Sequence, residues 1–167
     1  MILIYGGAVT APKPQRRARK IAMTPEEVAA FLDAERTCRV ATNGTNGPHA
    51  TPLWYLWEPS GDTGALWLTS LSRSQRWADL ERDPRIAVVV DAGHDYGELR
   101  GVELRGSVEI VGEVPRTGEP HPELERVEQA FADRYSGGHV LIDGRHAWLR
   151  LRPEKITSWD FRKIAQG

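Results

Sequence analysis

The sequence predicts a mainly β protein: an antiparallel barrel of six or seven strands with a few helices. Apolar and polar residues alternate strictly from Val102 to Ile110, as in a strand with one buried face. Two Asn-Gly pairs, at 43–44 and 46–47, are strong hairpin signals. Helices are predicted over only three segments, 24–35, 74–83 and 122–135. A barrel suits such a chain because closing the sheet leaves no unpaired strand edges.

Length and composition indicate one cytoplasmic domain. A chain of 167 residues buries about 70 % of its surface on folding, so it needs no disulfide or metal for stability. Since 22 Lys and Arg nearly balance 23 Asp and Glu, we expect no nucleic-acid or membrane partner. No apolar run is long enough to span a membrane. The single cysteine, Cys38, cannot form an internal disulfide, which favours a cytoplasmic location.

Residues 1–22 are predicted to be a flexible tail, and 23–167 the folded domain. An apolar stretch precedes the basic run 13–20, which is the reverse of the order in a secretory signal. Pro12 and Pro14 argue against regular structure, and we interpret the basic run as solvated.

The first helix begins with the capping sequence TPEE at 24–27, and its apolar residues Val28, Phe31 and Leu32 follow at helical spacing. Three strands come next, over 37–42, 49–57 and 65–70, with a turn at 59–62 before the third.

The helix over 74–83 ends before Pro84. The strand over 86–91 is a continuous apolar run, so we expect both of its faces to be buried. After the alternating strand, the loop 112–121 is rich in proline and glycine. The third helix carries an apolar stripe opposite acids and arginines. Two final strands are predicted on either side of Pro153, over 146–152 and 156–161.

Nucleophilic and metal chemistry are not predicted. The chain has no G-x-S-x-G motif, and Cys38 lies in a predicted strand, so we interpret it as a buried structural thiol. A metal site at His139 and His146 would need an acid such as Asp143, and loop histidines facing solvent are the simpler interpretation. The chain also lacks a P-loop and a G-x-G-x-x-G motif after a strand.

The segment 66–91 carries the strongest functional signal. Hydroxyls and two arginines gather where a strand ends and a helix begins, in the order Thr69, Ser70, Ser72, Arg73, Ser74, Gln75, Arg76. Free backbone N–H groups, the helix dipole and fixed cations favour a phosphate there. An ordinary capped helix with solvated arginines would show the same pattern, and the residues alone do not decide between the two.

Pro52 places the strand 49–57 at an edge or beside a groove, because proline donates no ladder hydrogen bond. The free side of such a strand can hydrogen-bond a flat heterocycle. Trp54 could stack on that ring or on a partner subunit, and core packing is the alternative for both Trp54 and Tyr55. Of the other tryptophans, Trp67 and Trp77 are predicted in the core, and Trp57 and Trp148 are undecided.

The segments GPHATPLWY, LTSLSRSQRWADLERDPRIAVVVD and LRGSVEIVGE resemble the pyridoxamine 5′-phosphate oxidase-like superfamily of flavin-binding split β-barrels. They are most similar to its actinobacterial flavin/deazaflavin oxidoreductases, many of which use coenzyme F420. The segment KITSWDFRKI fits the same group, so the resemblance covers roughly residues 24–112 and 146–164.

The resemblance implies a homodimer with cofactor sites at the subunit interface. The cofactor phosphate would lie on Arg76, at a position where relatives usually have lysine or arginine. The other implied cofactor-binding residues are Thr51, Pro52, Leu53, Trp54, Thr69, Ser70, Arg73, Ser74 and Gln75. Trp159 is a candidate for contact with the substrate or the partner subunit.

The implied function is that of an oxidoreductase in which reduced F420 gives a hydride to a small conjugated or heteroaromatic acceptor. No residue is singled out as an acid or base, since the cofactor carries the chemistry. The alternatives are an FMN-dependent oxidase or reductase of the same fold, and a non-enzymatic carrier of flavin, deazaflavin or haem.

Overall fold

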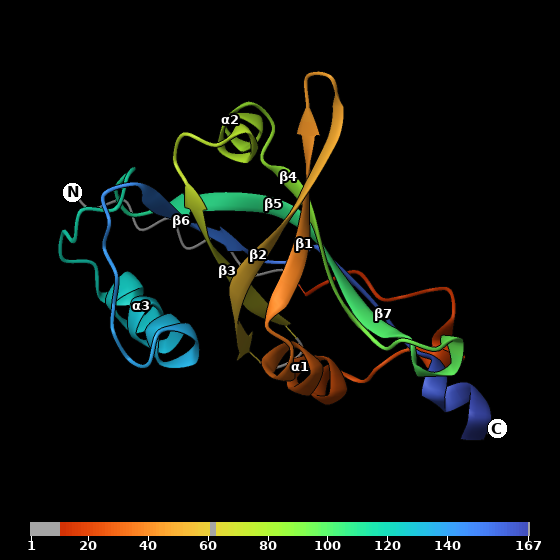
Figure 1. Cartoon of the computed structure of the whole chain (residues 1–167). Helices are drawn as coiled ribbons and strands as arrows, with labels where there is room; N and C mark the ends of the chain where they lie inside the picture. Colours follow the sequence, from red (N-terminus) through yellow and green to blue (C-terminus); the bar gives the residue numbers. More distant parts are fainter. Residues whose placement is uncertain (1–10, 61–62, 167) are drawn as a thin grey trace.

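Six antiparallel strands close into a barrel, and a seventh strand extends one of its sides (Figure 1). The computed structural model describes residues 11–60 and 63–166. The strands are β1 (Thr37–Gly44), β2 (Gly47–Ser60), β3 (Thr63–Leu71), β4 (Arg85–Ala92), β5 (Arg100–Val111), β6 (His146–Leu151) and β7 (Lys155–Asp160). Their order is β4-β1-β2-β3-β6-β5, and β5 pairs back onto β4 to close the barrel. The predicted fold class is therefore confirmed.

The strand β5 closes the barrel because it pairs with β4 and with β6. Residues 100–107 pair with β4 on one edge, and on the other edge 100–105 pair with β7 and 108–111 with β6. The strands β6 and β7 thus share one edge of β5, and Pro153 lies in the interruption between them. The first hairpin is also confirmed: Gly44 and Gly47 are its last pair, and Gly47 adopts a φ of 115° that favours glycine. The turn predicted at 59–62 includes residues 61 and 62, which lie outside the described residues.

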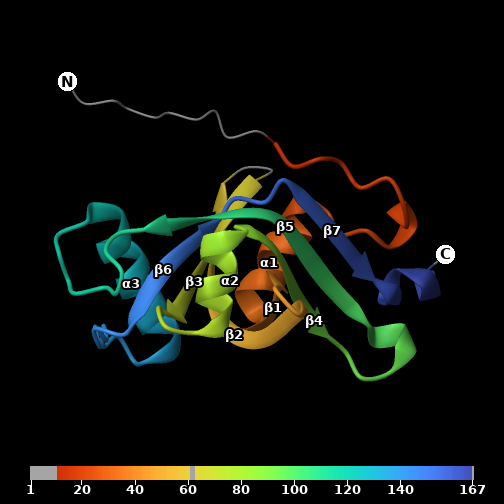
Figure 2. The same cartoon turned by 90° about the horizontal axis from the view of Figure 1, so that it is seen from above.

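The α-helices are α1 (Pro25–Ala34), α2 (Gln75–Arg82) and α3 (Pro122–Tyr135), and the 3-10 helices are η1 (Arg19–Ile21), η2 (Tyr96–Glu98) and η3 (Phe161–Gln166). The capping box at the start of α1 is present, with the Glu27 N–H donating to Thr24 Oγ1 and the Thr24 N–H donating to the Glu27 carboxylate. Figures 1 and 2 show α1 and α2 at opposite ends of the barrel, and α3 outside it. No α-helix in these described segments is long and apolar enough to cross a membrane.

Two hydrophobic clusters stabilise the fold. The larger one fills the barrel, and the smaller one joins α3 to the outer face of the sheet through Trp67, Val111, Leu124, Val127 and Trp148. Trp67 and Trp77 are buried as predicted, and so are Trp57 and Trp148.

One prediction about burial is wrong. In β4 only Ile86, Val88 and Val90 are buried, whereas Ala87 and Val89 are half-buried. A strand of an antiparallel barrel has one face toward the interior, so its apolar run does not imply two buried faces.

The described part of the N-terminal segment lies along β7. The Lys13 N–H donates to the Glu154 carbonyl at 2.8 Å. The Gln15 side chain accepts from the Ser158 N–H at 2.9 Å and donates to its carbonyl at 3.1 Å. Residues 1–10 lie outside the described residues, and the flexibility of 1–22 stays a prediction.

Candidate functional site

The N-terminal half of β2 has a free edge. Residues 47–54 pair with β1, but β3 pairs with β2 only over 55–60. The end of β3 instead follows β6 as far as Leu71. The backbone at 51–54 therefore lacks a strand partner on the β3 side in the described chain, which is the arrangement expected from Pro52.

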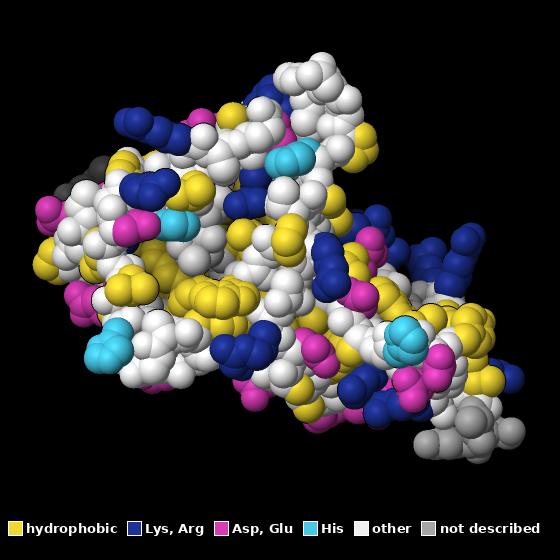
Figure 3. Space-filling model, in the orientation of Figure 1, with side chains coloured by type: hydrophobic (Ala, Val, Ile, Leu, Met, Phe, Trp, Pro, Cys, Tyr) yellow, Lys and Arg dark blue, Asp and Glu magenta, His cyan; other side chains and the backbone are white. Residues whose placement is uncertain are grey.

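A pocket of about 650 Å³ lies beside this edge. Its walls come from β2, from α3 with the loop that follows it, and from β3 and β6. The lining includes Pro52, Leu53, Trp54, Thr69, Phe131, Tyr135, His139, Leu141, Asp143, His146 and Trp148. Hydrophobic side chains gather between α3 and the strands in the space-filling view (Figure 3). The walls are mainly apolar, so the pocket suits a largely apolar molecule.

Trp54 lies at the pocket with much of its ring uncovered. Its side chain is 52 % exposed, and one face stacks on Tyr135 with ring centroids 4.7 Å apart. The Tyr135 hydroxyl donates to the Tyr55 carbonyl at 2.7 Å, which fixes the tyrosine ring against β2. Trp54 is therefore a supported aromatic platform rather than a core residue, while Tyr55 is fully buried.

Arg76 links the end of β3 to the free edge of β2. It lies in the first turn of α2 and is 8 % exposed. Its Nε donates to Ser70 Oγ at 3.2 Å, and its Nη1 donates to Thr51 Oγ1. Within the described segments, no carboxylate pairs with this guanidinium.

Burial lowers the pKa of Arg76, because desolvation disfavours the charged form. A buried cation bonded only to neutral hydroxyls is costly, and a bound anion would offset that cost. The cluster of Thr51, Ser70 and Arg76 therefore fits a phosphate.

The remaining predicted residues divide into two groups. Pro52, Leu53, Trp54 and Thr69 line the pocket, and Arg73, Ser74 and Gln75 surround the start of α2 outside its lining. Ser74 accepts from the Trp77 N–H as the helix cap, Gln75 donates to Asp79 at 2.8 Å, and Arg73 is exposed.

Trp159 lies away from the pocket. It is half-buried on β7 and packs against Gly101, where an added Cβ would come 2.3 Å from its ring. A role for Trp159 in subunit contact stays a prediction.

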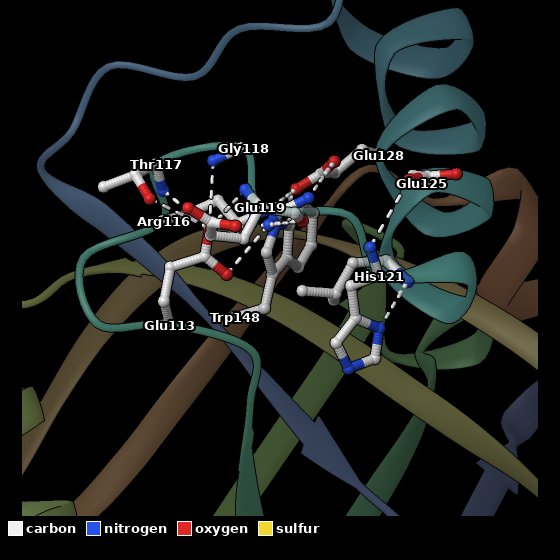
Figure 4. A network of polar contacts seen from close by, with 10 residues as sticks. Glu113, Arg116, Thr117, Gly118, Glu119, His121, Glu125, Glu128 and Trp148 are labelled. Carbon is white, nitrogen blue, oxygen red and sulfur yellow. Dashed lines mark hydrogen bonds and ion pairs between the residues drawn. The ribbon is translucent and has the colours of Figure 1, made fainter.

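The sequence analysis assigned no cofactor-binding residue to α3 or its flanking loops, which form a wall of the pocket. In this wall, Arg116 Nε donates to Glu128 at 2.6 Å and its Nη1 to Glu113 at 2.7 Å, while the Trp148 indole N–H donates to Glu128 at 3.1 Å (Figure 4). Arg116 and Glu128 are both nearly inaccessible. The available signal was the apolar run 140–142 in a loop flanked by His139 and Asp143.

Cys38 is fully buried, and burial raises the pKa of its thiol to about 12, which agrees with the predicted structural role. The described residues contain no group of three or more side chains placed to hold a metal ion.

A family model for pyridoxamine 5′-phosphate oxidase matches residues 24–160. The chain belongs to this family. The superfamily predicted from the sequence is therefore confirmed. No curated protein matches the chain.

Solved structures of other proteins have a similar fold. A conserved hypothetical protein of Mycobacterium tuberculosis is 31 % identical with a TM-score of 0.74, covering 90 % of this chain and 93 % of that one. An FAD-binding protein of Mesorhizobium loti is 19 % identical with a TM-score of 0.58, covering 82 % and 93 %. The haem storage protein HutZ of Vibrio cholerae is 14 % identical with a TM-score of 0.62, covering 82 % and 96 %. The last two comparisons concern the fold alone.

Proposed function

We propose that the protein is an oxidoreductase that binds a phosphate-bearing flavin-type cofactor and reduces a small conjugated or heteroaromatic acceptor. The observation that supports this proposal most strongly is Arg76, a buried cation that has only hydroxyl partners among the described residues. Its partner Thr51 lies on the free strand edge, whose next residues Pro52, Leu53 and Trp54 line the apolar pocket. Arg76, Ser70 and Thr51 would hold the phosphate, and the edge 51–54 would bind the ring. When bound, the cofactor supplies the hydride, while the protein binds and orients the reactants.

Family resemblance favours coenzyme F420 over FMN. It also favours a cytoplasmic homodimer with the cofactor at the subunit interface. Sedimentation analysis of the purified protein at micromolar concentration tests the dimer, and a monomeric mass would contradict it.

Direct titration with F420 and with FMN tests the cofactor site. Wild-type protein should bind one of them in the micromolar range, and Arg76→Ala should weaken that binding by roughly 10- to 100-fold through the loss of charge-assisted hydrogen bonds. Arg85→Ala is the control, since Arg85 is exposed and pairs with Asp83 on the surface. Circular dichroism would verify that each variant is folded.

Two results would overturn the proposal: wild-type protein that binds neither cofactor, or Arg76→Ala protein that binds as tightly as Arg85→Ala. Haem titration tests a different function. A Soret band on adding haem, with no cofactor binding, would support a carrier like the haem proteins that share this fold.

A further inference from the structure

The segment 13–20, the basic arm, carries five cations and no acid. These cations are Lys13, Arg16, Arg17, Arg19 and Lys20. All five residues are exposed, and within the described segments none of them forms an ion pair with a carboxylate. The first acidic residue of the chain is Glu26. The net charge of −1, on which the expectation of no membrane partner rests, does not report this local separation of charge.

The basic arm is fixed to the free edge of β7 at both of its ends (Figure 2). The Gln15 side chain is hydrogen-bonded to both backbone groups of Ser158, and the Met23 N–H donates to Ser158 Oγ at 2.9 Å. Between these anchors the chain turns at Ala18, which has a φ of 53°, into η1. The cations of residues 16–20 are therefore presented together beside one strand.

The charged residues at the two ends of β7 leave this edge positive. Asp160, at the end of the strand, is paired with Arg162 at 2.6 Å. Glu154, just before the strand, is exposed, but the cation Lys155 follows it and lies beside Lys13 of the basic arm. Neither acid therefore cancels the charge of the arm.

The sequence that precedes the basic arm has no charged side chain. Residues 1–9 are MILIYGGAV, in which three aliphatic residues, Ile2, Leu3 and Ile4, are followed by Tyr5. A basic segment is attracted to anionic lipid, and apolar side chains next to it gain from burial in the bilayer interface. A nucleic acid offers phosphates to the cations but no apolar phase for the aliphatic side chains. The combination therefore favours a bilayer as the partner.

We propose that the basic arm docks the protein on a bilayer surface that contains anionic lipid, with residues 2–5 supplying apolar contact. The inference is independent of the proposed oxidoreductase function, because the arm includes neither Arg76 nor any residue of the pocket lining. The binding is peripheral and reversible, since exposed cations act on the lipid headgroups through screened electrostatics. Docking brings the protein to apolar molecules that dissolve in the bilayer, and the pocket suits a largely apolar molecule.

Co-sedimentation of the full-length protein with vesicles tests the surface. Wild-type protein should sediment with vesicles of phosphatidylcholine containing about one-third phosphatidylglycerol at about 0.1 M salt, and should be released at about 1 M salt. It should not sediment with vesicles of phosphatidylcholine alone. Sedimentation with neither kind of vesicle, or equally with both, would overturn the proposal.

A pair of arginines separates the arm from the net charge. Arg16→Ala with Arg17→Ala should weaken binding to the anionic vesicles by about 30-fold, since each basic residue near such a surface contributes about fivefold. Arg85→Ala with Arg126→Ala is the matched control, because it removes the same charge from exposed ion pairs elsewhere. The control should bind nearly as tightly as wild-type protein. An equal loss in both double variants would contradict a docking role for the arm.

Two further arms of the experiment test the apolar contact and the kind of partner. Deletion of residues 2–9 should weaken binding to anionic vesicles while leaving it sensitive to salt, and unchanged affinity would overturn the apolar contact. Single-stranded poly(U) RNA should not displace wild-type protein from the vesicles at equal phosphate concentration. Full displacement by the RNA would assign the arm to nucleic acid and overturn the bilayer proposal. Circular dichroism would verify that each variant is folded.

Discussion

Truncating Glu128 to alanine should destabilise the fold strongly. The Glu128 side chain is 7 % exposed and accepts from Arg116 Nε at 2.6 Å, Arg116 Nη2 at 3.2 Å and the Trp148 indole N–H at 3.1 Å. The truncation would leave three buried N–H groups without partners. It would also leave the Arg116 charge, itself 4 % exposed, paired only with Glu113.

The expected cost is about 3–5 kcal/mol, the usual effect of removing one partner of a buried ion pair. The surviving Glu113 contact points to the lower end of that range. Arg126→Ala on the same helix is the matched control. Its ion pair with Glu58 leaves the arginine 58 % exposed, so its loss should cost about 0–1 kcal/mol.

Urea unfolding followed by tryptophan fluorescence would measure both free energies. Glu128→Gln should fall between the two variants, because its amide can still accept a hydrogen bond. Replacing the pair together, Arg116→Met with Glu128→Leu, should cost less than Glu128→Ala, since no unpaired charge stays buried. A Glu128→Ala protein as stable as Arg126→Ala would refute the reasoning.

Three further outcomes follow from other parts of the structure. The Cys38 thiol, with its pKa raised by burial, should react with a disulfide reagent only after unfolding in urea; rapid reaction of the native protein would contradict its burial. Gly101→Ala should destabilise by about 1–3 kcal/mol because the new methyl group would meet the Trp159 ring and the Val90 carbonyl. Calorimetric melting would measure the loss, and Trp159→Ala in the Gly101→Ala background should relieve the part of the clash that the ring causes. Burial alone would raise the pKa of Asp143, but hydrogen bonds from the Arg145 and His146 N–H groups and from the His146 ring lower it to about 2. Asp143 thus has a folded pKa below its ordinary 3.8, so it contributes stability above pH 4 that is lost as pH falls toward 2. The unfolding free energy of Asp143→Asn should therefore vary less with pH over that interval, and identical pH profiles would count against the hydrogen bonds described.

Local sequence patterns predicted much of the fold correctly. The helix predicted over 122–135 has those bounds in the structure, because proline at its first position and an apolar stripe act within one segment. The hairpin at 43–47 and the capping box at Thr24 are equally local. The β4 strand shows the limit: its apolar residues predicted a strand correctly, but only the barrel determines which face is inside.

The candidate phosphate cluster could be predicted from the sequence because α2 follows β3 directly. Ser70 and Arg76 are six positions apart, and Thr51 joins them through the neighbouring strand. The opposite wall of the pocket could not be predicted from the sequence, because it depends on contacts such as the hydrogen bond from Tyr135 to Tyr55, 80 positions earlier. Periodicity shows that Tyr135 lies on the apolar stripe of a helix but not which strand that stripe covers.

The sequence by itself therefore determined the strands, the helices, the family and the gathering of hydroxyls and arginines at the start of α2, since each depends on neighbouring residues. Only the tertiary structure decided that Arg76 is buried with no acidic partner among the described residues, that α3 closes a pocket over Trp54, and that Asp143 orients His146 within it. Those properties depend on contacts between distant segments, and closure of the barrel with the packing of α3 on its outer face creates them.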